Sequence, residues 1–87
     1  MKVIKSDGRL QNFDLSKIKT SIDRASDDAR QPLNESDLEN LARNIEKSLK
    51  NYQKDSIHSD IIQKFVLREL EKQGFKIVAE YYRQGKI

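Results

Sequence analysis

The sequence predicts an α+β domain in which an N-terminal β-hairpin caps a bundle of about four α-helices. Three observations lead to this prediction. Short β-prone runs flank an Asp-Gly pair near the start of the chain, apolar residues then recur at helical spacing, and capping residues separate the helical runs. Because the chain has 87 residues and no cysteine, we expect a single domain, 1–87, without disulfides or cysteine-ligated zinc.

The hairpin is expected over residues 2–13. The pair Asp7-Gly8 tolerates the positive φ angles of a tight turn between two short strands. Asp14 follows as a helix N-cap, because its carboxylate can accept hydrogen bonds from the free N–H groups of the first helical turn.

Four helices are expected, each with an apolar stripe, over residues 15–29, 37–50, 60–73 and 76–84. A capping box, Ser36-x-x-Glu39, is expected to begin the second helix, and Ser59 is the expected N-cap of the third. Gly74 marks the end of the third helix. The last segment suits a strand by propensity, but its apolar residues also fit one helical face and would pack on a helical bundle, so we predict a helix.

The formal charge of +3 resides in the first quarter of the chain, where residues 1–20 hold five basic and two acidic side chains. Lys17 would be the third residue of the first helix, where a cation opposes the helix dipole at a cost of about 0.3–1 kcal/mol. An anion bound between Lys5, Lys17 and the helix N-terminus would make this placement useful. The alternative is that Lys17 and Lys19 are solvated helix lysines.

Two motifs in this region carry a resemblance to a known family. The run Lys5-x-Asp7-Gly8-Arg9, followed by Phe-Asp-x-x-Lys-Ile over residues 13–18, resembles the opening of the ATP-cone. This regulatory nucleotide-binding module occurs at the N-terminus of many ribonucleotide reductases and in the repressor of reductase genes. Later residues keep the family's order, so the similarity spans essentially the whole chain: Ile57, Ser59, Ile62, Ala79 and Tyr82.

The resemblance implies a set of nucleotide-binding residues: Val3, Lys5, Ser6, Gln11, Asp14, Lys17, Ile18, Ser59 and Lys86. The lysines would contact phosphates, whereas Val3 and Ile18 would pack on the base. Gln11 and Asp14 would contact base or ribose, and Ser59 would lie near the nucleotide. The structural alternatives stay open: an edge-protecting lysine at position 5, ordinary core residues, and helix caps.

One residue departs from the family pattern. Where the family usually has Lys-Arg-Asp-Gly, this chain has Ser6 in place of the arginine. The substitution removes a bidentate phosphate donor, so we expect a change in affinity or in the preference between ATP and dATP.

No catalytic or metal site is predicted, because the sequence has no P-loop, no carboxylate cluster with metal spacing and no nucleophile–base pair. We therefore expect a non-catalytic, allosteric module that binds ATP or dATP, with Mg²⁺ accompanying the triphosphate. The expected partners are a second copy of the chain, as a homo-oligomer, or a reductase. No apolar run suggests a membrane segment or a signal peptide, so the expected location is the cytoplasm.

Two other functions remain open from the sequence. The missing arginine is compatible with a protein-interaction domain whose nucleotide site is degenerate. The isoelectric point of about 9.2 is compatible with a nucleic-acid-binding module. The few aromatic residues do not interleave with basic ones as in a base-stacking surface, so nucleic acid is not an expected partner.

Overall fold

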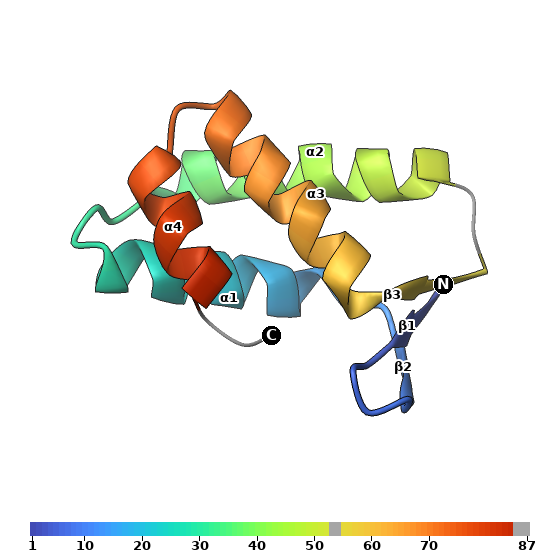
Figure 1. The fold of residues 1–87 in the computed structure, drawn as a ribbon. Helices are drawn as coiled ribbons and strands as arrows, with labels where there is room; N and C mark the ends of the chain where they lie inside the picture. Colours follow the sequence, from blue (N-terminus) through green and yellow to red (C-terminus); the bar gives the residue numbers. More distant parts are fainter. Residues whose placement is uncertain (53–54, 85–87) are drawn as a thin grey trace.

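The computed structural model describes residues 1–52 and 55–84, and it confirms the α+β prediction. A small three-stranded sheet lies at one end of four helices (Figure 1). The elements in chain order are β1 (Lys2–Ile4), β2 (Leu10–Asn12), α1 (Leu15–Asp28), α2 (Glu35–Tyr52), β3 (Ser56–His58), α3 (Ser59–Lys72) and α4 (Lys76–Gln84).

The sheet has the order β2-β1-β3, with β1 antiparallel to β2 and parallel to β3. The sequence did not predict β3. It is three residues long, and its only strongly apolar residue, Ile57, is opposite Val3 in the register. Since its pairing partner lies more than fifty positions earlier in the chain, no local pattern could reveal this strand.

The hairpin turn is a three-residue loop. The N–H of Lys5 donates to the carbonyl of Arg9 at 2.8 Å, and the N–H of Gly8 donates to the carbonyl of Lys5 at 2.8 Å. Gly8 has φ +89°, as expected, but Asp7 does not share the positive φ. The Asp7 carboxylate instead accepts from the backbone N–H of Arg9 at 3.1 Å and pairs with its guanidinium at 2.7 Å. The backbone N–H of Arg9 is the main reason that the pKa of Asp7 is lowered.

The predicted cap of α1 is confirmed, because Asp14 accepts from the backbone N–H of Ser16 at 3.0 Å. The predicted caps of α2 and α3 are wrong. Asn34 caps α2, and its side-chain oxygen accepts from the N–H of Asp37 at 2.7 Å, so the helix begins before Ser36.

Glu39, assigned to a capping box, instead forms an ion pair with Lys19 of α1. At α3 the strand β3 runs directly into the helix. The N-cap is His58, which makes no side-chain capping bond, and Ser59 is the first helical residue.

The apolar stripes of the four helices meet in one core. The last segment is a helix, as predicted, and α4 packs against α1 and α3. Only part of its predicted apolar face is buried, because Ile77 is 49% exposed and Tyr81 is 42% exposed. The largest fully buried apolar side chains of the core are Ile22, Leu41, Ile45, Leu49, Ile57, Val66, Leu70 and Val78.

The C-terminal ends of α1 and α3 share one hydrogen-bonding motif but differ in the residue that takes the left-handed conformation. Both α1 and α3 finish in a Schellman motif, with six-to-one hydrogen bonds from Gln31 to Ser26 (2.9 Å) and from Phe75 to Leu70 (2.8 Å). The left-handed position is Gly74 after α3, as expected, but Arg30 after α1, with φ +57°.

Within the described residues no helix is long and apolar enough to cross a membrane.

Candidate functional site

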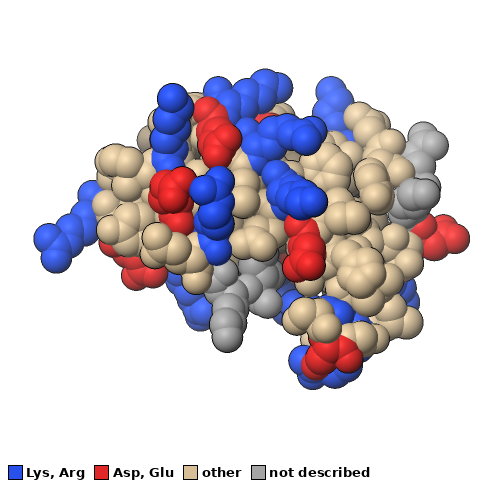
Figure 2. Space-filling view, viewed as in Figure 1, with Lys and Arg blue, Asp and Glu red and all other residues tan. Residues whose placement is uncertain are grey.

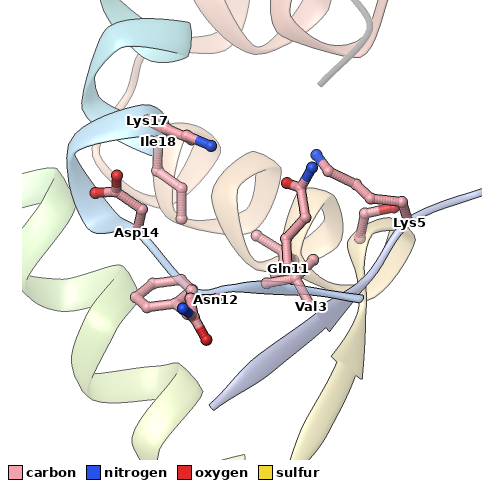
Figure 3. A pocket seen from close by; sticks show the side chains of 10 residues that line it. Val3, Lys5, Gln11, Asn12, Asp14, Lys17 and Ile18 are labelled. Atoms are coloured by element: carbon pink, nitrogen blue, oxygen red, sulfur yellow. The ribbon is translucent and has the colours of Figure 1, made fainter. Parts of the chain in front are cut away.

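A pocket opens where the sheet meets the first turn of α1 and the start of α3 (Figure 3). The space between its lining residues, counted out to the open mouth, is about 400 Å³. Three apolar side chains from three elements contribute to its wall: Val3 of β1, Ile18 of α1 and Ile62 of α3. All three are buried, so the apolar surface is held in place by the core.

Two lysines stand at the rim of the pocket. Lys5 follows β1, and Lys17 lies in the first turn of α1. Figure 3 shows their ammonium groups directed toward one another from opposite sides, with the side-chain amide of Gln11 between them. Lys5 is half-buried and Lys17 is exposed, so both ammonium groups can meet a ligand without leaving a buried charge behind.

Asp14 adds a carboxylate to the same rim. Its Oδ1 accepts from the Ser16 hydroxyl at 2.6 Å and from the Ser16 backbone N–H at 3.0 Å. These hydrogen bonds, the hydroxyl first, lower the pKa of Asp14 below its ordinary value, so the group is ionised at neutral pH. The pocket therefore has a cationic side near the lysines and one fixed anion at the N-cap.

The structure brings seven of the nine predicted site residues to this pocket. They are Val3, Lys5, Gln11, Asp14, Lys17, Ile18 and Ser59. Ser6 lies in the exposed hairpin turn and does not line the pocket. Lys86 lies outside the described residues.

Sequence reasoning missed three lining residues, which are Asn12, Phe13 and Ile62. Ile62 was visible as part of the apolar stripe of α3 and of the family's order of residues, but neither shows which members of the stripe reach the pocket. Phe13 was visible as the end of the hairpin and as part of the Phe-Asp-x-x-Lys-Ile motif. Nothing in the sequence indicated that Asn12 would line a pocket.

The lining of this pocket combines apolar and charged side chains, which can bind a ligand. No group of three or more His, Cys, Asp or Glu side chains within the described ranges could hold a metal ion. An apolar wall beside two lysines and a helix N-terminus suits a ligand with a flat apolar part and an anionic part.

The fold and the pocket thus define a class of protein, a small α+β domain with an apolar and partly cationic pocket beside a β-hairpin. The family model for the ATP cone domain matches residues 1–84, and the chain belongs to this family. Membership supports a nucleotide-binding regulatory module.

The chain is also similar to curated proteins called transcriptional repressor NrdR. It is 36% identical to the protein of Carboxydothermus hydrogenoformans and 33% identical to that of Limosilactobacillus reuteri, in each case over 97% of this chain and 55% of the relative. It is 31% identical to the protein of Syntrophus aciditrophicus, over 94% of this chain and 52% of the relative. The chain therefore spans about half the length of these relatives, which are named as repressors and not as reductases.

Proposed function

We propose that this chain is a non-catalytic regulatory module that binds ATP or dATP in the pocket beside the hairpin. Bound nucleotide would change how the protein that carries the module assembles. The observation that carries the proposal is the convergence of Lys5 and Lys17, from different elements, above an apolar wall at the N-terminus of α1. Family membership, found independently of this geometry, supports a nucleotide as the ligand.

In the proposed complex the phosphates lie between Lys5 and Lys17, where two ammonium groups and the positive end of the α1 dipole act together. The base packs on the wall that includes Val3 and Ile18. The Gln11 amide can donate and accept hydrogen bonds at the boundary between these two parts.

Asp14 is expected to face the ribose rather than the phosphates. An ionised carboxylate repels phosphate oxygens, but it accepts hydrogen bonds from sugar hydroxyl groups. This placement makes Asp14, together with Ser59 at the start of α3, the expected source of any preference between ATP and dATP. A Mg²⁺ ion would be held mainly by the phosphate oxygens and would need no strong protein ligand.

Ser6 bears on the alternative of a degenerate site. Because Ser6 lies in the exposed turn outside the pocket, the arginine usual at this position would extend from the hairpin toward the rim rather than form the wall. Its loss would weaken phosphate binding but would leave the two lysines and the apolar wall in place. The geometry therefore favours a working site over a pure interaction domain.

The assembly that the module regulates is proposed from the relatives. Their name, transcriptional repressor, favours a place in gene regulation over a place in a reductase. The same name counts against our expectation that nucleic acid is not a partner.

The test is calorimetric titration of this 87-residue chain with ATP and dATP, with and without Mg²⁺, while size-exclusion chromatography follows the oligomeric state. We expect saturable binding of about micromolar affinity, near −8 kcal/mol, and a different oligomer with each nucleotide. CTP is the control, because it carries the same triphosphate with a smaller base. Absence of binding at millimolar ATP would overturn the proposal and leave an interaction domain.

A further inference from the structure

A second charged surface lies away from the pocket, on the outer sides of α2 and α3. Six exposed basic residues form two rows at helical spacing, which we call the basic face: Arg43, Lys47 and Lys50 on α2, and Lys64, Arg68 and Lys72 on α3. At a rise of 1.5 Å per residue the rows are about 10 and 12 Å long. Both rows lie opposite the buried stripes of their helices.

The two rows lie on neighbouring helices, because α2 and α3 pack side by side. The Asn44 amide of α2 donates to the carboxylate of Glu69 of α3 at 3.3 Å, and the rings of Tyr52 and Phe65 meet edge to face at 5.9 Å. The Arg68 guanidinium stands 5.9 Å above the same Phe65 ring, at the seam between the helices. Figure 2 shows Lys and Arg side chains over α3 and along the upper edge, where Figure 1 places α2, with Asp and Glu side chains between some of them.

The fold directs some of the acidic side chains of α2 and α3 away from the basic face, while Glu46 and Asp60 stay one helical turn from Lys50 and Lys64. Residues 21–87 hold 12 basic and 12 acidic residues, so the sequence suggests no excess of charge there. In the structure Glu39 turns to Lys19 on α1, and Glu71 and Glu80 pair with Arg83 of α4.

The Glu69 carboxylate lies between the two helices and forms no ion pair with the basic face within the described residues. Glu69 is 8% exposed, and it accepts hydrogen bonds from the amides of Asn44 and Gln73 rather than from a cation. The hydrogen bonds of Glu69 are therefore made within the seam, as is usual for a buried polar group.

The cations of the basic face are available to a partner. Lys50 has one weak ion pair, 4.0 Å from Glu46. Within residues 1–52 and 55–84, none of the other five has a carboxylate oxygen within 4.0 Å. A row of unpaired cations on two adjacent helices fits an extended anion with repeated charges better than a compact one.

We propose that the basic face binds the phosphate backbone of double-stranded nucleic acid, independently of base sequence and separately from the nucleotide pocket. Duplex DNA presents one negative charge per about 1.7 Å of helix axis, so rows 10–12 Å long can each contact several phosphates. Because exposed lysines and arginines supply the contacts, binding is governed by salt, with a dissociation constant of about 10⁻⁴–10⁻⁶ M at physiological ionic strength.

The experiment uses fluorescence anisotropy of a labelled 20-base-pair DNA duplex titrated with the 87-residue chain between 50 and 200 mM salt. The test variant carries Lys47→Glu and Arg68→Glu, one change in each row. The matched control carries Arg24→Glu and Lys76→Glu, which remove exposed cations from α1 and α4 and alter the net charge by the same amount. A second test variant, Lys47→Gln with Arg68→Gln, removes the cations without adding carboxylates, and circular dichroism verifies the fold of each protein.

We expect the test variant to lose at least about tenfold in affinity at low salt, and the slope of log K against log salt to fall by about 2. The control should lose no more than about threefold and keep its slope. Equal losses in the two variants would overturn the proposal, because net charge alone would then explain binding. Absence of binding by the unaltered chain at 50 mM salt would also overturn it. Equally tight binding of a poly-glutamate peptide would assign the surface to an acidic protein instead.

Discussion

Replacing Lys17 by alanine should weaken nucleotide binding without destabilising the free domain. It lies in the first turn of α1, where its charge opposes the helix dipole, and at the rim of the pocket, where its ammonium group faces that of Lys5. A hydrogen bond from a charged group contributes about 1.5–3 kcal/mol. The Lys17→Ala variant should therefore bind ATP about 10- to 150-fold more weakly.

The same change should not destabilise the free domain. Removing the cation relieves an unfavourable interaction of about 0.3–1 kcal/mol, and alanine is the best helix former. For a domain of this size the melting temperature should stay the same or rise by about 1–8 °C. Calorimetric titration and thermal melting followed by circular dichroism measure the two effects on the same preparation.

Lys19→Ala is the matched control for this prediction. It removes the same charge from the same helix, but Lys19 points to Glu39 of α2 and does not line the pocket. The hydrogen bond with Glu39 raises the pKa of Lys19, so this variant should lose some stability and keep its affinity for ATP. If Lys17→Ala kept full affinity, or if both variants lost affinity equally, the proposed position of the phosphates would be refuted.

Three further changes test the fold beneath the site. Gly8→Val should lower stability by about 1–2 kcal/mol, because a side chain resists φ +89°; a Cβ there would meet no atom within 4 Å, so the cost is purely conformational. Gly8→Asn should cost less. Equal melting temperatures of the two variants would contradict the described turn. Ile22→Ala should cost about 2–5 kcal/mol in urea unfolding, since Ile22 is 0% exposed, whereas Ile77→Ala at a 49% exposed position should change stability by less than about 0.5 kcal/mol. The pKa of Asp14 is lowered in the folded state, so its charge contributes fully above its ordinary pKa of 3.8, and this contribution disappears as the pH falls below that value. The melting temperature of Asp14→Asn should accordingly lie below that of the unaltered chain at pH 7 and approach it below pH 3.8, and a constant difference would argue against the cap.

The parts of the fold that depend on neighbouring residues could be predicted from the sequence. The apolar stripe that begins at Ile18 and Ile22 reflects a helical period, and Asp14 was recognisable as a cap because its role needs only the next few N–H groups. The error at the start of α2 came from competition between two equally suitable residues. Asn34 and Ser36 can both cap a helix, and the choice between them depends on where the chain enters the bundle.

The candidate site was predicted in part for the same reason. Lys5, Lys17 and Gln11 stand close to one another in the chain, on a hairpin and the helix after it, so a local motif could place them together. Ile62 reaches the pocket only because α3 begins at the sheet, and β3 makes that connection through pairing with β1. Long-range pairing of this kind leaves little trace in a single sequence.

The sequence by itself determined the helical periods, the hairpin turn, the cap of α1 and the concentration of net charge in the first twenty residues. These properties depend on side chains within a few positions of one another. Only the tertiary structure decided how the neutral remainder of the chain distributes its charges. Packing of α2 against α1 and α3 turned Glu39 toward Lys19 and buried Glu69, and it left Arg43, Lys47 and Arg68 on the outside. A carboxylate neutralises a cation only when the fold brings the two together, and their numbers in the sequence do not reveal that distance.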